Sequence, residues 1–212
     1  MKIKFRTEAL SYFLLVIIAT FAASISDAHT INLNNPTRDS LQIKADSLKQ
    51  LYTLATFSHV NKEIYEKQFF DEFPATFNQL NDLYGDKENK PAMLNNEAEN
   101  HIIDLFNKIK SVNDTIYYRK IIGIAIGGRW DADAVNYFQH GLRERVENNV
   151  ALTIYLLKKL KAADIKSFWF FYFDGAHPKK QIPDALQKVK LLDSKIYTLM
   201  IEAQNELFKQ KE

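Results

Sequence analysis

Apolar residues recur at helical spacing along most of the chain. Between residues 39 and 57, for example, the apolar positions share one face of a helix with 3.6 residues per turn: Leu41, Leu48, Leu51 and Leu54. The same spacing returns in segments that begin or end at capping residues, glycine or proline, namely 58–69, 74–84, 95–112, 114–126, 131–147, 149–160, 165–173 and 183–207. We therefore predict an all-α fold of about eight to nine helices, arranged as an irregular antiparallel helical bundle or a stack of helix pairs.

Segment 114–126 fits two kinds of secondary structure. It contains five isoleucines, and β-branched residues favour strands. Asn113 and Asp114, however, are typical N-cap residues, and both neighbouring segments are predicted helices. We therefore predict a helix here, which Gly127 and Gly128 end.

The first residues have the pattern of a secretory signal peptide. Three basic residues precede an apolar run at 9–23, which is short for a membrane span of about 20 residues. Small residues follow the apolar run. We predict a signal peptide at residues 1–28, cleaved after Ala28; cleavage after Ser24 and an uncleaved N-terminal anchor are the alternatives.

The remainder of the chain is of a size that normally forms one domain. Residues 29–38 contain three asparagines and a proline and are predicted to be a disordered tail. Residues 39–212 are predicted to form a single α-helical domain, because either half alone would have a small core. The polar segment 85–92 is a candidate sub-boundary within that domain.

Composition narrows the compartment and the possible partners. The 212 residues include no cysteine, which excludes a lipid-modified cysteine, disulfides and thiol catalysis. With the signal-peptide pattern, we therefore expect a periplasmic or secreted protein that is not a lipoprotein. Its stability must come from packing, for which 15 Phe and 10 Tyr supply material. A formal net charge of +2 gives no field that would attract nucleic acid, and membrane contact is expected only through an uncleaved signal peptide.

Motifs of catalysis are missing from the sequence. The glycines near position 125 lack the Lys-Ser/Thr that follows a phosphate-binding loop. The chain has no Gly-x-Ser-x-Gly elbow and no His-Glu-x-x-His metal motif. We therefore favour a protein without enzymatic activity and predict no cofactor and no bound metal.

Segment 127–140 carries the most unusual group of polar residues. Four of them fall at i, i+3, i+4 and i+7 and share one helix face, namely Asp133, Asn136, Tyr137 and His140. A carboxylate and an imidazole on one face could bind a metal or move a proton. One alternative function is therefore a metal-dependent hydrolase or metal-binding domain, with Asp131, Asp133, His140 and His177 as its residues. The structural explanation is that the two aspartates stabilise a helix N-terminus and the other side chains meet a neighbouring helix or water.

Two features near residue 170 also have more than one explanation. The loop before His177 could be a helix-ending turn, in which Asp174 accepts backbone donors and Gly175 supplies positive φ. Segment 168–173 consists of aromatic residues only, and such a helix is either buried on all sides or contacts a partner. Burial is the favoured interpretation.

Segments 128–138 and 167–178 look similar to parts of uncharacterised bacterial exported helical proteins. Some proteins of this kind are immunity partners that neutralise a rival's toxin, so the resemblance implies protein binding and brings no catalytic residues with it. We predict an exported, non-enzymatic protein-binding domain of this type, with a protein partner; the metal-dependent domain and a structural envelope protein are the alternatives. The candidate binding residues are Arg129, Trp130, Asp131, Asp133, Asn136, Tyr137, His140, Trp169, Tyr172, Asp174 and His177.

Overall fold

The computed structural model describes residues 36–87, 90–176, 178 and 180–211. These residues form ten α-helices, two short 3₁₀ helices and one pair of two-residue strands, so the all-α prediction is confirmed. The predicted signal peptide and residues 29–35 of the predicted tail lie outside the described residues, whereas residues 36–38 of that tail belong to the first described helix. In chain order the elements are α2 (Pro36–Phe57), α3 (Lys62–Glu72), α4 (Phe77–Tyr84), β1 (Asp86–Lys87), β2 (Lys90–Pro91), η1 (Asn95–Glu97), α5 (Ala98–Asn107), α6 (Asp114–Ala125), α7 (Ala134–Asn148), α8 (Val150–Leu157), α9 (Ala162–Phe173), η2 (Asp184–Lys188), α10 (Val189–Leu192) and α11 (Ser194–Lys211).

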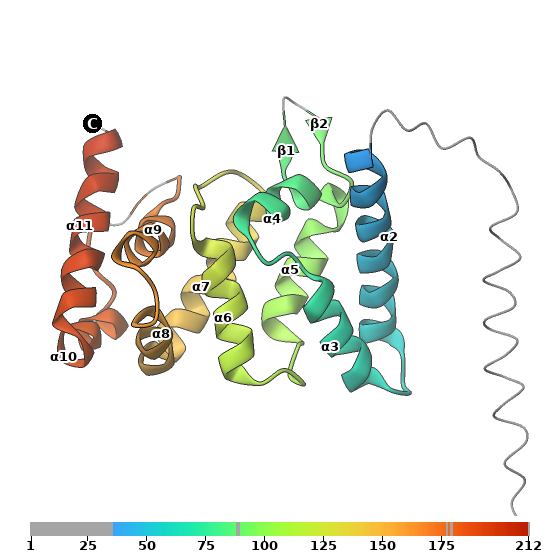
Figure 1. The fold of residues 1–212 in the computed structure, drawn as a ribbon, viewed down its shortest axis with the longest axis horizontal. Helices are drawn as coiled ribbons and strands as arrows, with labels where there is room; N and C mark the ends of the chain where they lie inside the picture. The colour runs from blue at the N-terminus through green and yellow to red at the C-terminus, as the bar shows by residue number, and fades with distance from the viewer. Residues whose placement is uncertain (1–35, 88–89, 177, 179, 212) are drawn as a thin grey trace, which may run out of the picture. The chain divides into compact units, whose positions relative to one another are not determined.

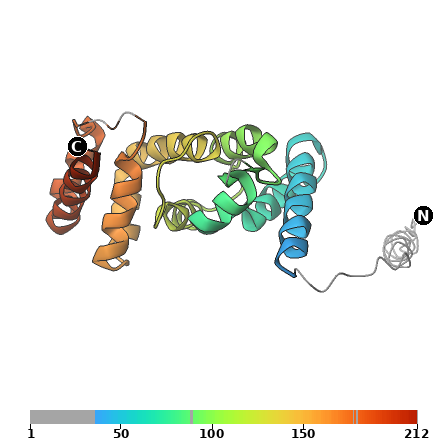
Figure 2. The ribbon, with the colours of Figure 1, turned by 90° about the horizontal axis from the view of Figure 1, so that it is seen from above.

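The helices of the compact unit Ser40–Glu212 are stacked in chain order. Figures 1 and 2 show α2 and α3 at one end of this unit and α10 and α11 at the other. Helix α5 packs on α7, α6 on α8 and α9, and α9 on α11. Because short connections join successive helices, the arrangement matches the predicted stack of helix pairs. In the described part of the chain, no helix combines the length and the hydropathy that crossing a bilayer requires.

The six aromatic residues at 168–173 belong to α9, which is packed between neighbouring helices. Helix α9 contacts α11 on one side and α6 and α7 on the other. Each of its six aromatic side chains, Phe168 to Phe173, is at most 6% exposed. The interpretation of this run as core is therefore confirmed, and the alternative of an exposed partner surface does not hold.

Helix starts depend on single polar side chains, and several differ from the sequence-based expectation. The helix at 114–125 is confirmed, and Asn113 caps it by accepting from the Thr115 N–H at 2.9 Å. Pro74 does not lie in the first turn of α4, because Thr76 is the N-cap and accepts from the Gln79 N–H at 3.3 Å. Apolar spacing alone does not distinguish between neighbouring cap residues.

The C-terminal region departs furthest from expectation. The chain from residue 183 is not one long helix: it forms η2 and α10, breaks at Asp193, and continues as α11. The Asp193 carboxylate accepts from the Ile196 N–H at 2.9 Å and so caps α11. An aspartate that competes for backbone donors can interrupt a helix without changing its apolar spacing. The apolar spacing therefore did not predict the break at Asp193.

Basic side chains of neighbouring helices cap the C-terminal ends of three helices. Lys120 of α6 donates to three carbonyl oxygens at the end of α3. Arg145 of α7 donates to the Phe106 carbonyl near the end of α5. Arg143, also of α7, donates to the Tyr172 carbonyl at 2.9 Å near the end of α9. Cations at helix C-termini satisfy unpaired carbonyls and complement the helix dipole, so these contacts join α6 to α3 and α7 to both α5 and α9.

Close packing of α5 on α7 requires a glycine at position 141. A Cβ atom there would lie 2.3 Å from two ring atoms of Phe106. Overpacking costs about 1–3 kcal/mol, against about 1 kcal/mol gained from the better helix propensity of alanine. Gly141→Ala should therefore lower the free energy of unfolding by up to about 2 kcal/mol in urea titrations, because a contact of 2.3 Å forces the packing to shift. Gly123→Ala, whose Cβ would lie 3.3 Å from its nearest neighbour, should have the smaller effect; equal stability of Gly141→Ala and wild type would contradict the prediction.

Candidate functional site

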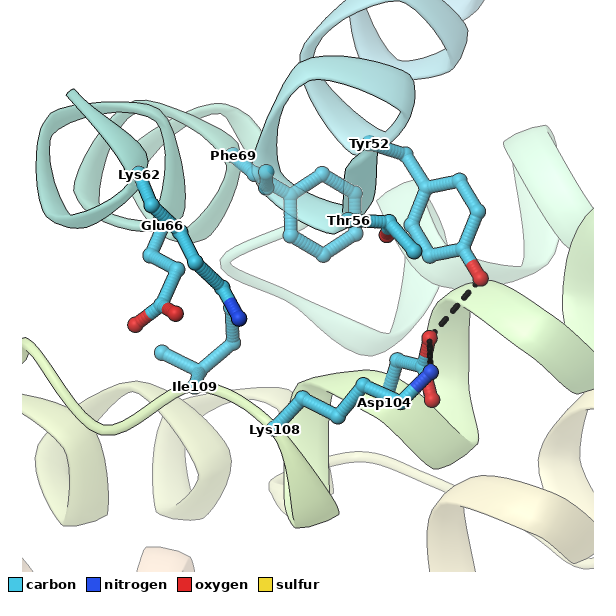
Figure 3. A pocket seen from close by; sticks show the side chains of 9 residues that line it. Tyr52, Thr56, Lys62, Glu66, Phe69, Asp104, Lys108 and Ile109 are labelled. Atoms are coloured by element: carbon cyan, nitrogen blue, oxygen red, sulfur yellow. Dashed lines mark hydrogen bonds and ion pairs between the residues drawn. The ribbon is translucent and has the colours of Figure 1, made fainter. Parts of the chain in front are cut away.

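Helices α2, α3 and α5 surround a cavity of about 180 Å³ near one end of the compact unit, seen in Figure 3. This volume corresponds to roughly six water molecules at about 30 Å³ each. A few converging polar groups are typical of ligand sites, and this cavity is smaller than the pockets of about 300–1,000 Å³ that hold drug-sized molecules. The lining residues are Tyr52, Ala55 and Thr56 of α2, Lys62, Glu66 and Phe69 of α3, and Asp104, Lys108 and Ile109 at and after the end of α5.

Asp104 is a buried carboxylate on one wall of this cavity. It accepts a hydrogen bond from the Tyr52 hydroxyl at 2.8 Å and pairs with the Lys108 ammonium, also at 2.8 Å. Lys108 lies one helical turn after Asp104, at the i+4 position that favours such a pair. A buried carboxylate needs donors of this kind, so the interaction ties α2 to α5.

Glu66 is the second buried carboxylate of the cavity wall. Its Oε2 accepts from the backbone N–H groups of Lys110 and Ser111, at 3.2 and 3.3 Å. The Ser111 hydroxyl donates to the same oxygen at 2.6 Å. Glu66 therefore attaches the loop that follows α5 to α3, and this loop forms one edge of the cavity.

A further tyrosine and a histidine support the Tyr52 wall. The Tyr52 ring lies against the buried His101 ring, with 4.3 Å between their centroids, and His101 Nδ1 lies 3.0 Å from the Tyr84 hydroxyl. Burial, helped by the Asp104 charge, raises the pKa of Tyr52 to about 12. Burial lowers the pKa of His101 to about 4. At neutral pH the tyrosine is therefore protonated and the imidazole is neutral.

The helix face predicted from the sequence is partly present on α7. Tyr137 and His140 line a separate cavity of about 230 Å³ between α5 and α7, together with Glu144. Asn136 is exposed and does not line that cavity. Asp133 is exposed as well and precedes the helix, with φ of 51° and no capping hydrogen bond from its side chain. Tyr137 and His140 thus line the same cavity, whereas Asn136 and Asp133 do not line it.

The residues before α7 hold a loop in place. Trp130 is half-buried, and its backbone N–H donates to Asp174 at 2.7 Å; the Gly175 N–H donates to the same carboxylate at 2.9 Å. Asp174 thus accepts backbone donors, as the turn interpretation predicted. The Arg129 guanidinium lies over the Phe170 ring, 4.1 Å from its centroid. Asp131 does not cap α7, because its carboxylate accepts from the next backbone N–H, that of Ala132, at 2.8 Å.

The remaining predicted residues do not form a surface site. Trp169 and Tyr172 are buried in the α9 packing, and the Tyr172 hydroxyl donates to Glu147 at 2.6 Å. Their aromatic character reflects the core, and burial removes them from contact with a partner. His177 lies outside the described residues. Among the residues that the structure describes, no three His, Asp or Glu side chains are placed to hold a metal ion.

The apolar spacing of the sequence does not reveal the cavity between α2, α3 and α5. It singles out neither Tyr52 nor Asp104 nor Lys108. The available signal was a pair of polar residues on the buried face of α5, His101 and Asp104, which lie at i and i+3 among apolar neighbours. A buried face with charged residues indicates that partners come from another helix.

Comparisons with known proteins add no family to these observations. No protein-family model matches the chain, and neither the curated proteins nor the solved structures contain a match.

Proposed function

We propose that the chain is an exported, non-enzymatic binding protein that recognises a partner protein at the α2–α3 end of its compact unit. The observation that carries the proposal is a cluster of exposed apolar side chains around the turn between these helices. Phe57 and Val60 are each 70% exposed, and Ile64 is 52% exposed. Large apolar side chains that gather on a surface mark interaction sites, because covering them removes apolar area from water.

The position of this cluster links it to the cavity. Thr56 and Lys62 line the cavity, and each of the three exposed apolar residues lies within two positions of one of them in the sequence. A partner that covers the α2–α3 turn therefore lies beside the cavity as well. Apolar residues at the centre of an interface and polar groups around them are the usual composition of protein–protein contacts.

The protonation states of the cavity wall support recognition rather than catalysis. General acids and bases work best when their pKa lies near the operating pH. Burial moves the pKa of Tyr52 and the pKa of His101 away from neutrality, in opposite directions. An immunity-type protein, which neutralises a toxin by covering it, is one form of this function; the signal-peptide pattern at residues 1–28 supports export.

Cross-linking in the producing cells, followed by quantitative mass spectrometry, tests the proposal. The triple variant Phe57→Ser/Val60→Ser/Ile64→Ser should recover the main cross-linked partner at least about tenfold less than wild type, since central apolar residues each contribute about 1 kcal/mol or more. The matched control replaces two exposed apolar residues elsewhere, Ile116→Ser/Leu191→Ser, and should keep the partner. Unchanged melting temperatures establish folding. Equal recovery by the triple variant, or no partner with wild type, would refute the proposal.

A further inference from the structure

The cavity between α2, α3 and α5 has free hydrogen-bond donors, whereas one oxygen of each of its two buried carboxylates is already occupied. One oxygen of Glu66 takes three donors, and one oxygen of Asp104 takes two. The Lys62 ammonium, which Figure 3 shows directed toward the cavity, forms no hydrogen bond or ion pair with another described residue. Lys108 donates to Asp104 and keeps further N–H groups for another acceptor.

We propose that this cavity binds a carboxylate group, presented as an acidic side chain by the partner protein. The inference rests on the proposed function and deepens it. A carboxylate has two oxygens, which can accept from Lys62 on the α3 wall and from Lys108 on the α5 wall. Hydrogen bonds between ammonium and carboxylate groups are stronger than neutral ones. The apolar surfaces of Phe69 and Ile109 contact the methylene groups of the entering side chain.

The charges of the cavity favour a carboxylate over other ligands. A cationic ligand would approach the Lys62 ammonium, which has the same sign, and the oxygens Glu66 Oε2 and Asp104 Oδ2 already take donors from the protein. A phosphate carries more negative charge than one unpaired and one paired ammonium can offset beside two carboxylates. The volume of about 180 Å³ suits the end of an aspartate or glutamate side chain.

Propionate, which carries the acidic end of a glutamate side chain, is the probe for this inference. Titrated into the ¹⁵N-labelled protein, it should shift the amide signals of Thr56, Lys62 and Ile109 saturably. Propionamide, its neutral isostere, should bind at least tenfold more weakly. Lys62→Met should weaken propionate binding about tenfold and Lys62→Arg should largely restore it, because Lys62 is exposed and its replacement leaves the core unchanged. Lys67→Met, on the same helix but outside the cavity lining, is the control and should bind as wild type does.

Several outcomes would overturn the inference. Equal binding of propionate and propionamide would show that the cavity does not select charge. Unchanged affinity in Lys62→Met, or displacement of propionate by lower concentrations of inorganic phosphate, would reject the assigned donor or the assigned ligand. Partner recovery that depends on Phe57, Val60 and Ile64 without propionate binding would leave the proposed function standing and reject the carboxylate. Propionate binding without recovery of a partner protein would leave the carboxylate site standing and reject the proposed function.

Discussion

Acidification from pH 7 to pH 4 is expected to destabilise the protein by about 3 kcal/mol through His101 alone. The pKa of this imidazole falls from 6.5 to about 4 on folding. Each unit of difference between the folded and unfolded pKa corresponds to about 1.4 kcal/mol. The main cause is burial, which disfavours the charged ring; Glu97 and Asp104 oppose the shift, and Lys49 adds to it.

The sign follows from the protons bound in each state. Between pH 6.5 and pH 4 the unfolded chain protonates His101, whereas the folded protein keeps it neutral. The unfolded state therefore binds more protons in this interval, and stability falls as the pH falls. The contribution is fully present above pH 6.5 and is lost as the pH approaches 4. The neutral ring remains paired with the Tyr84 hydroxyl, which suits a buried polar group.

Urea titrations at pH 7 and pH 4 measure this contribution. His101→Gln removes the titrating ring, so its stability should fall by about 3 kcal/mol less than that of wild type over the same interval. Carboxylates contribute to acid destabilisation in both proteins, and the comparison cancels them. His140→Gln, at an exposed histidine of α7, is the matched substitution. If His101→Gln and His140→Gln lose equal stability on acidification, the buried neutral His101 is not the cause.

The helices were predictable because apolar spacing outweighs local propensity. Segment 114–126, most of which forms α6, contains five isoleucines and could have formed a strand by composition. It is a helix because its apolar residues meet α4, α8 and α9 at helical spacing. The break at Asp193 was not predictable from this spacing, since apolar residues continue on both sides of it. Helix boundaries depend on single capping hydrogen bonds, which a periodic pattern does not encode.

The cavity was not predictable for a different reason. Tyr52, Glu66 and Asp104 belong to three helices, and periodicity shows which face of each helix is buried but not which faces meet. The predicted polar face on α7 was only partly correct for a local reason. Asp133 has positive φ and precedes α7. Its side chain therefore does not follow the helical spacing that places Tyr137 and His140 on one face. A backbone conformation of this kind is rare outside glycine and asparagine and has no clear sequence signal.

Replacing Lys120 by methionine should lower the free energy of unfolding by about 2–3 kcal/mol at pH 7. The Lys120 ammonium donates to the carbonyl oxygens of Phe70, Asp71 and Phe73 at the end of α3, at 2.9 Å for Asp71 and 2.7 Å for Phe73. It also lies 4.7 Å from the centroid of the Phe70 ring. Methionine keeps most of the apolar stem of lysine but donates nothing, so the helix end loses its donors.

Two effects compete at Lys120, and their balance fixes the sign. Burial lowers the pKa of Lys120 to about 8, which means that the charged form is disfavoured, although the side chain is still protonated at pH 7. Removing the charge relieves that cost but leaves three carbonyls unpaired, at about 1 kcal/mol or more each. We expect the lost hydrogen bonds to dominate, because unpaired carbonyls at a helix terminus have no partner within the helix. Arg119→Met, at the exposed neighbouring position, should change stability by less than about 0.5 kcal/mol in the same urea titrations. If the two variants are equally stable, Lys120 does not hold α6 to the end of α3.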